Sequence, residues 1–302
     1  MSTTWLRDYL REKRPNLSES SLITYTSILS TLYKRVFGDS DENPDPKKFE
    51  YYEKVLQYLH MMPPPTRKTV LSALIVATGG NEEYRKQMLE DINSYNKQIK
   101  TQEKTPQQKE SWVDSSHIRA VWEDLQSKAN RLYKLPDKTP ADLQQIQQFV
   151  LLTVLGGIFM APRRSLDWTA FKANDVDSAK DNYLDKKRKE LVFNRYKTAK
   201  VYHQQRVACP PEVLKILNRW IKLLPTREYL FFDIAGNPLS SVKVNQRFVK
   251  IFGKNAGVNQ MRHTYLTDKY GHTLEENKKI AQTMEEMGSS PAQLTLYVKK
   301  TD

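Results

Sequence analysis

The sequence is poor in cysteine and has no long apolar run. Its one cysteine, Cys209, excludes an internal disulfide, and the five histidines do not combine with it at the spacing of a zinc site. No run of about 18 apolar residues occurs, so no membrane span is predicted. The first residues lack the apolar core of a secretion signal. We therefore expect a soluble, intracellular protein with no metal ion or other cofactor.

Acidic residues are fewer than basic ones. The chain has 35 Asp and Glu against 48 Lys and Arg, which gives a net charge of +13. Because the two signs are interspersed, the excess indicates a folded surface with a polyanionic partner. Nucleic acid is the first choice, a membrane surface the second, and a charge that only maintains solubility the third. At 302 residues the chain can form two domains, each with its own core.

The first hundred residues carry apolar side chains at helical spacing. Such stripes run over residues 5–10, 22–33 and 49–59, and the prolines at 63–65 end the third helix before a fourth begins. Residues 101–111 are polar and contain one proline, which is typical of a linker. We predict a helical domain over residues 1–100, a linker over 101–111 and a second domain over 112–302.

The second domain mixes helices with a few strands. Thr139, Pro140 and Asp142 form a strong helix start, and the apolar segment 149–155 that follows belongs in a core. Residues 190–208 alternate around a short polar turn and predict a hairpin. The fold class is therefore mainly α (α+β), with a small antiparallel sheet in the second domain.

The C-terminal segment holds residues suited to cutting a phosphodiester without a metal ion. Arg262 opens an apolar segment, a Met-Gly-Ser-Ser turn follows at 287–290, and Tyr297 stands nine residues after Gly288. A tyrosine can attack a phosphate and remain attached to it. Guanidinium groups suit the charge that develops on the phosphate oxygens, and a lysine can protonate the leaving 5′ hydroxyl.

This constellation resembles the active site of the tyrosine recombinases, the phage-integrase family of DNA strand-exchange enzymes. Residues 161–168, Ala-Pro-Arg-Arg-Ser-Leu-Asp-Trp, are similar to the first-arginine motif of that family. A Lys-Thr pair at 197–198 and the Gly-Asn-Pro-Leu-Ser turn at 236–240 match further motifs. The resemblance covers residues 112–302 specifically and 1–110 in outline. It implies a helical core-binding domain that binds DNA, followed by a mixed α/β catalytic domain.

The resemblance also implies roles for individual residues. Arg164 and Arg262 would hold the scissile phosphate, Lys197 would act as the acid, and Tyr297 would be the nucleophile. Arg163 is an alternative to Arg164 that the sequence leaves open, and Lys200 is the fallback for Lys197. Residues expected to contact DNA are Lys172, Lys200 and a stripe on one predicted helix, which consists of Lys243, Arg247, Lys250 and Lys254.

Four further positions are expected to support the site, and three of them depart from the family pattern. Asp167 stands where a glutamate usually supports the first arginine, and His263 follows Arg262 in a position that usually packs inside. Asn259 and Ser289 replace residues that can carry a proton. Because Asn and Ser can hydrogen-bond a phosphate oxygen but do not shuttle protons at neutral pH, the expected deficit is in acid–base efficiency rather than in the arginine clamp.

The resemblance implies a metal-independent, site-specific recombinase or integrase that forms a 3′-phosphotyrosine on double-stranded DNA. A homodimer or homotetramer on DNA is expected, with no membrane partner. The sequence looks more like integrases of large eukaryotic DNA viruses or mobile elements, for which the nucleus or a virus-associated compartment is the expected location. Two alternatives are a type IB topoisomerase and a catalytically impaired, sequence-specific DNA-binding protein on the same scaffold.

Overall fold

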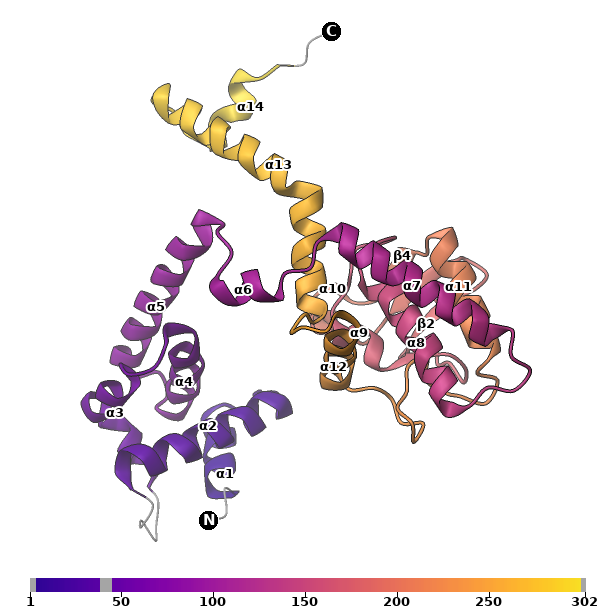
Figure 1. The fold of residues 1–302 in the computed structure, drawn as a ribbon. Helices are drawn as coiled ribbons and strands as arrows, with labels where there is room; N and C mark the ends of the chain where they lie inside the picture. The colour runs from indigo at the N-terminus through magenta and orange to yellow at the C-terminus, as the bar shows by residue number, and fades with distance from the viewer. Residues whose placement is uncertain (1–3, 39–44, 300–302) are drawn as a thin grey trace. The chain divides into compact units, whose positions relative to one another are not determined.

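The computed structural model describes residues 4–38 and 45–299 of the chain, which divides into two compact units (Figure 1). The first unit is Met1–Lys104 and the second is Thr105–Asp302. The predicted linker is not irregular throughout, because residues 106–111 form a short helix. Thr105 caps this helix through a reciprocal pair of hydrogen bonds with Gln108, as a capping box does.

The described part of the first unit is helical. Its elements are α1 Thr4–Lys13, α2 Glu19–Phe37, the 3-10 helix η1 Pro46–Glu50, α3 Tyr52–Leu59, α4 Pro64–Ala77 and α5 Glu82–Thr101. Helix α4 packs against α1, α2, α5 and η1, so it forms the centre of this core. Its residues Leu71, Leu74 and Ala77 are fully buried. The apolar stripes of the sequence therefore mark the helices correctly.

A buried ion pair joins α4 to α5 in the first unit. The guanidinium of Arg67 donates to both carboxylate oxygens of Asp91, at 2.8 Å from Nε and 2.5 Å from Nη2. Both side chains are largely buried, and Arg67 also donates to the carbonyl oxygen of Met62. A bidentate pair of this kind fixes the relative position of two helices as well as neutralising the buried charge.

The second unit adds a small sheet to a larger set of helices. Its elements are α6 Pro106–Ser111, α7 Ser115–Tyr133, α8 Pro140–Leu155, α9 Ser165–Thr169, β1 Phe171–Lys172, β2 Asn182–Asp185, β3 Glu190–Phe193, α10 Ala199–Tyr202, β4 Gln205–Ala208, α11 Pro211–Lys222, α12 Ser241–Phe252, α13 Val258–Glu286, the 3-10 helix η2 Pro291–Gln293 and α14 Leu294–Tyr297. The predicted mainly α fold with a small sheet is confirmed.

The sheet has four strands in the order β1-β2-β3-β4. Strands β2, β3 and β4 pair antiparallel, as predicted, but β1 pairs with β2 in parallel, so the sheet is mixed. The prediction of a hairpin with a short turn was wrong in one respect. Strands β3 and β4 are connected by residues 194–204, which include the helical turn α10. Thr198 and Ala199 start this turn instead of continuing the strand.

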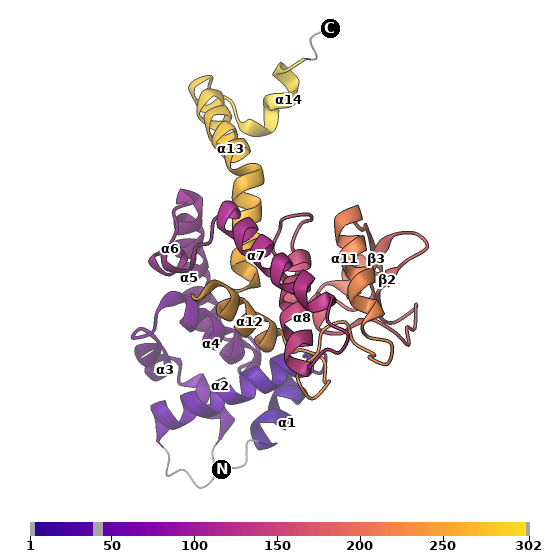
Figure 2. The same cartoon turned by 45° about the vertical axis from the view of Figure 1, so that its right-hand side comes forward.

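The core of the second unit forms around α8. Thr139 and Asp142 cap this helix reciprocally, and residues Ile146 to Leu155 are nearly all buried. Helices α7 and α8 lie side by side (Figure 2). The indole of Trp168 stacks on Phe171, with ring centroids 4.8 Å apart, and so joins α9 to the sheet. This packing fixes the backbone that carries the two adjacent arginines of the sequence.

Helix α13 has two halves with different environments. Its first half is anchored by the buried residues Val258, Met261 and Thr264, and Thr264 donates to the carbonyl oxygen of Val113 over 2.7 Å. From Tyr265 to Thr283 every residue is partly or fully exposed. Figure 1 shows this part projecting from the rest of the second unit, with α14 near its end.

Candidate active site

The two adjacent arginines of the first-arginine motif have different environments. Arg164 is the N-cap residue of α9, and its exposed guanidinium has no hydrogen-bond or ion-pair partner among the described residues. Arg163 is partly buried, with a side chain that is 18% exposed, and donates from Nε to the Oδ2 atom of Asp167 over 2.9 Å. The arrangement leaves Arg164 accessible to a ligand and engages Arg163 internally.

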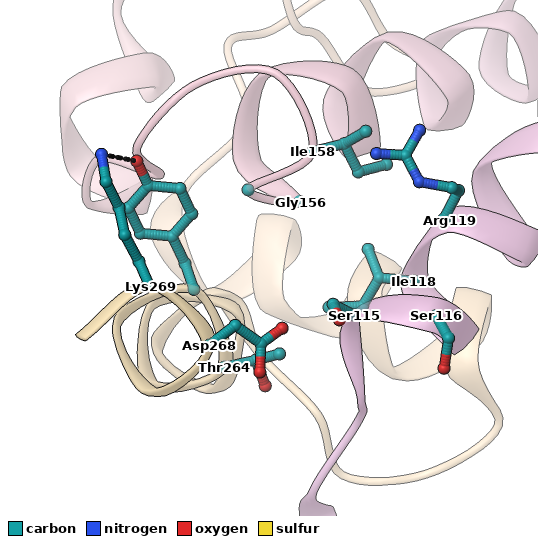
Figure 3. Close-up of a pocket in the computed structure, with 11 residues that line it drawn as sticks. Ser115, Ser116, Ile118, Arg119, Gly156, Ile158, Thr264, Asp268 and Lys269 are labelled. Atoms are coloured by element: carbon teal, nitrogen blue, oxygen red, sulfur yellow. Dashed lines mark hydrogen bonds between the residues drawn. The ribbon is translucent and has the colours of Figure 1, made fainter. Parts of the chain in front are cut away.

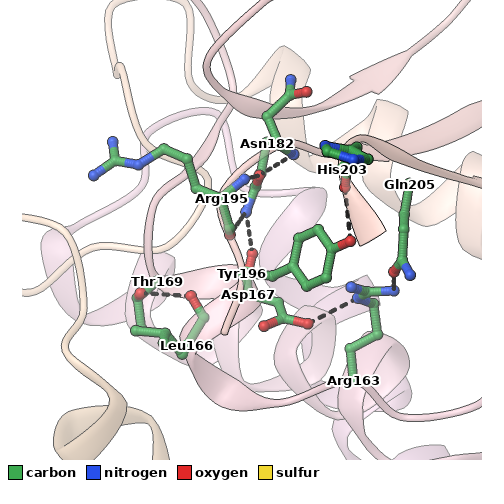
Figure 4. Close-up of polar contacts among 10 residues, drawn as sticks. Arg163, Leu166, Asp167, Thr169, Asn182, Arg195, Tyr196, His203 and Gln205 are labelled. Carbon is green, nitrogen blue, oxygen red and sulfur yellow. Dashed lines mark hydrogen bonds and ion pairs between the residues drawn. The ribbon is translucent and has the colours of Figure 1, made fainter. Parts of the chain in front are cut away.

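Further contacts hold the Arg163 guanidinium on its other sides. Its Nη1 atom donates to Oε1 of Gln205 in β4 over 2.9 Å (Figure 4). Its Cζ atom lies 4.0 Å from the ring centroid of Phe193 and 5.2 Å from that of Tyr196. Cation–π contacts strengthen when the cation is withdrawn from water, as here. Arg163 thus joins α9 to β3 and β4.

Asp167 is a buried carboxylate whose pKa is influenced by three arginines. It is 3% exposed, and its second oxygen, Oδ1, is buried and accepts no hydrogen bond from any described residue. Burial raises the pKa of Asp167, and the charges of Arg163, Arg164 and Arg262 oppose that rise. Arg164 of α9 and Arg262 of α13, which lie far apart in the sequence, thus both act on the charge of this carboxylate.

Lys197 and Lys200 lie in the connection between β3 and β4. Lys197 occupies the turn before α10, and Lys200 lies within α10. Both side chains are exposed, and no partner is found for either ammonium group in the described part of the chain. Two exposed lysines on this connection can reach a phosphate backbone, so the placement is compatible with either lysine as the acid.

Lys172 does not lie at the surface expected of a DNA contact. It belongs to β1, is 9% exposed and forms an ion pair with Glu228. Its ammonium group also lies 4.6 Å from the ring centroid of Tyr229. Because its charge is already compensated by a carboxylate and an aromatic ring, we correct the sequence-based expectation and assign Lys172 a structural role.

The basic stripe on α12 is only partly available to a ligand. Lys243 pairs with Asp233 at 2.7 Å, and Lys254 donates to the carbonyl oxygen of Trp112. Arg247 donates to Oε1 of Gln144, and desolvation lowers its pKa. Lys250 is exposed and has no partner among the described residues. With Gln144 and Gln148 of α8, three of these cations line an open cleft of about 590 Å³: Lys243, Arg247 and Lys250.

Three of the supporting residues lie at the two ends of α13. Asn259 and His263 lie one turn apart beside Arg262, with Nδ2 and Nε2 3.3 Å apart, and both side chains are exposed. The expectation that His263 packs inside was therefore wrong. Its helix face is the solvent side, whereas Met261 and Thr264 take the core side. Ser289 follows the far end of α13 and donates to Oε1 of Gln293 over 2.7 Å.

Tyr297 is not brought to the arginines in this structure. It ends α14, is 57% exposed, and α14 packs on η2. From Arg262 to Glu286 the chain follows one helix, which at 1.5 Å per residue covers roughly 36 Å along its axis. The phenol and the arginine pair therefore lie at separate places on the second unit.

A cavity of about 480 Å³ lies beside the first half of α13 (Figure 3). It is lined by the start of α7, by Gly156 and Gly157, and by side chains of α13 that include Asp268. Lys269 donates to the hydroxyl of Tyr265 at its rim over 3.3 Å, a hydrogen bond that raises the pKa of Lys269. Its lining includes none of the predicted catalytic residues, and we assign no reaction to it.

Across residues 4–38 and 45–299, no group of three or more His, Cys, Asp or Glu side chains is arranged to hold a metal ion. No helix in the same ranges combines the length and the apolar character needed to cross a membrane.

Sequence reasoning did not find two residues that organise this region, Gln205 and Asn182. Gln205 accepts a hydrogen bond from Arg163, forty-two positions away, and Asn182 donates to the backbone carbonyl oxygens of Asp167 and Arg195. Neither belongs to a motif. The one available signal was that a polar asparagine opens the buried strand β2.

No protein-family model matches the sequence, and no curated protein matches it. Among solved structures, the chain is similar to that of XerA recombinase, with 14% identity, 88% of this chain and 82% of that chain covered, and a TM-score of 0.34. It is similar to lambda integrase bound to DNA, with 14% identity, coverage of 89% and 88%, and a TM-score of 0.46. The chain is also similar to a lambda integrase dimer bound to a COC′ core site, with 14% identity, 87% of this chain and 69% of that chain covered, and a TM-score of 0.46. At such identities and TM-scores, the functional proposal rests on the residues of this chain.

Proposed function

We propose that this protein is a site-specific recombinase or integrase that cuts and rejoins duplex DNA through a covalent 3′-phosphotyrosine. The observation that supports the proposal is that the charges of Arg164 and Arg262 both act on the buried carboxylate of Asp167. Two exposed or partly exposed guanidinium groups near one carboxylate suit a phosphate, because each can donate paired hydrogen bonds to its oxygens.

In the proposed reaction the two arginines stabilise the pentacovalent phosphate. The Tyr297 phenol loses its proton to water as its oxygen forms a bond to phosphorus, the bond to the 5′ oxygen breaks, and Lys197 gives that oxygen a proton. Reversal of the same steps by a second 5′ hydroxyl rejoins the strand and releases the tyrosine. Asn259 lies beside Arg262 and can donate a hydrogen bond to the phosphate, although it cannot transfer a proton at neutral pH.

The position of Tyr297 adds a requirement to this mechanism. Because α13 separates the phenol from Arg262 of the same chain in this structure, attack needs either a second copy of the chain or a different placement of α14. A site assembled on DNA from two or four copies meets this requirement. The cations Lys200, Lys250 and Arg247 are the candidates for contacts with the flanking phosphates.

The proposal is tested by trapping the covalent intermediate. The protein is incubated in EDTA with nicked duplexes from which the cleaved strand cannot be rejoined, and SDS-resistant protein–DNA complexes are measured. The wild type and a Tyr270→Phe control, which removes an exposed phenol from α13, should form the complex, and Tyr297→Phe should not. A complex that persists in Tyr297→Phe would identify another nucleophile, and tight binding without any complex would support the alternative of a DNA-binding protein.

A further inference from the structure

Asn182 connects the two segments that carry Arg164 and Lys197. It opens β2, its side chain is fully buried, and its Nδ2 atom donates two hydrogen bonds. One goes to the carbonyl oxygen of Asp167 in α9 and the other to that of Arg195 in the β3–β4 connection, both over 2.7 Å (Figure 4). The first segment begins with Arg164, and the second leads directly to Lys197.

The oxygen of the same amide holds the connection as well. Oδ1 of Asn182 accepts from the backbone nitrogens of Asn194 and Arg195, at 2.8 Å and 2.7 Å. A primary amide has two donor hydrogens and two acceptor positions, and here all four are used. Such a side chain specifies one geometry, because any other would leave a buried polar group unpaired.

Other contacts close the frame around the connection. The hydroxyl of Tyr196 donates to the carbonyl oxygen of His203 over 2.7 Å, and Gln204 donates to Oδ1 of Asn194 over 2.8 Å. On the opposite side, Arg163 links Asp167 to Gln205 at the start of β4. The loop that carries Lys197 is thus connected to Asp167 of α9 at both of its ends, through Asn182 at one end and Arg163 at the other.

We propose that Asn182 is a positioning residue whose amide ties the Arg164 segment to the Lys197 loop, so that both cations are held in a fixed relation to the scissile phosphate. The inference rests on the proposed function for the identity of the ligand. It differs from a role in stability alone, because it requires the loop of residues 194–204 to lose its position when the two donor hydrogen bonds are removed.

The test uses Asn182→Asp and a matched control, Asn174→Asp. The first change keeps an oxygen for the two backbone nitrogens and replaces the donor group by a carboxylate oxygen that faces two carbonyl oxygens. Asn174 makes the same kind of double donation, to the carbonyl oxygens of Leu224 and Arg227 at 2.6 Å and 2.8 Å, but it holds a different loop. Thermal unfolding of both variants measures how much stability each change removes.

Trypsin digestion of the native protein measures how readily the loop opens, independently of activity. Arg195, Lys197 and Lys200 are exposed cleavage sites within it. Loss of two buried hydrogen bonds should make cleavage in residues 194–204 about tenfold faster in Asn182→Asp, because local opening becomes easier. Cleavage there should stay at the wild-type rate in Asn174→Asp.

The rate of covalent-complex formation under single-turnover conditions measures the effect on catalysis. Asn182→Asp should lower the rate about 10-fold to 100-fold, the scale of a misplacement near 1 Å, with DNA affinity changed by less than about threefold. Lowering the pH should recover part of the rate, because a protonated carboxyl can donate one hydrogen bond again.

The outcomes separate this inference from the proposed function. Loop cleavage at the wild-type rate in Asn182→Asp overturns it. So does an equal loss of reaction rate in both variants at equal loss of stability. If the wild type forms no covalent complex with any DNA, the proposed function fails, and the digestion alone then decides whether Asn182 fixes the loop.

Discussion

Arg163 and Asp167 form an ion pair at 2.9 Å across the first turn of α9, and this pair gives two neighbouring arginines different environments. With its guanidinium engaged by Asp167, Gln205 and the ring of Phe193, Arg163 has little capacity left for a ligand. Arg164, next to it, has an exposed guanidinium. We therefore propose Arg164, rather than Arg163, as the phosphate ligand.

Substitution of each arginine should produce a different defect. Arg164→Ala should lower the rate of covalent-complex formation about 100-fold to 1000-fold, the effect of removing one donor to a developing oxyanion, with little change in thermal unfolding. Arg163→Ala should lower the unfolding temperature, because it leaves a buried carboxylate unpaired. Rate and unfolding temperature, measured on both variants, check the assignment. A stable but inactive Arg163→Ala protein beside an active Arg164→Ala protein would reverse it.

Removal of the Arg163 charge should also make stability depend on pH. Burial already raises the pKa of Asp167, and loss of Arg163 removes the main opposing effect, so the pKa rises further. The folded state of Arg163→Gln then binds a proton more readily than the unfolded state, whose Asp has a pKa of about 3.9. Stability must therefore fall as pH rises from that value through the folded-state pKa.

Urea denaturation of Arg163→Gln and the wild type at acidic and neutral pH measures this effect. The difference in unfolding free energy should reach about 3 kcal/mol at neutral pH and shrink as the pH is lowered toward 4. Arg206→Gln, which disrupts an ion pair with a third of its side chain exposed, is the control and should show a small, nearly constant difference. A pH-independent loss in Arg163→Gln would show that Asp167 stays ionised without its partner.

The separation of Tyr297 from Arg262 along α13 predicts complementation between copies. Arg164→Ala retains the tyrosine, and Tyr297→Phe retains the arginines, so a mixture of the two inactive proteins should form covalent complexes on DNA. The attached protein should be the Arg164→Ala chain, which a size tag on one variant reveals. Attachment that requires both residues in one chain would show instead that α14 moves to the site of its own chain.

The ion pair of Arg67 and Asp91 predicts a large effect on the first unit. Asp91→Ala leaves a guanidinium that is 11% exposed without its carboxylate and should cost about 3 to 5 kcal/mol in unfolding free energy. Glu82→Ala, which removes an exposed partner of Arg85, should cost less than about 1 kcal/mol. Chemical denaturation of the two variants makes the comparison. Equal losses would mean that the buried pair does not join α4 to α5 as described.

The helices of this fold are readable from the sequence because their signals are local. Thr139 and Asp142 cap α8 within one turn, and the apolar spacing of α2 and α4 lies within single segments. The environment of a charged side chain depends on residues distant in the sequence. Lys172 has Glu228 as its partner, so its burial could not be inferred from its own neighbours. Arg163 pairs with nearby Asp167, but its second contact, with Gln205, could not be inferred in this way.

The candidate site shows the same division. The order of Arg164, Lys197, Arg262 and Tyr297 could be read from motifs, and the charges of Arg164 and Arg262 both act on Asp167. The connection after β3 could not, because α10 interrupts an alternating pattern that is typical of strands. The position of Tyr297 depends on the uninterrupted course of α13, although Gly271 lies within that helix and disfavours it.

The central claim, that Arg164 and Arg262 together hold the charge of one phosphate, is tested most directly by removing that charge from the DNA. Covalent-complex formation is measured for the wild type, Arg164→Ala and Arg262→Ala on duplexes with a phosphate or a neutral methylphosphonate at the cleaved position. The account predicts that each substitution costs about 100-fold or more on the phosphate and much less on the methylphosphonate. Equal losses on both substrates would contradict it, because the arginines would then act elsewhere than on the phosphate.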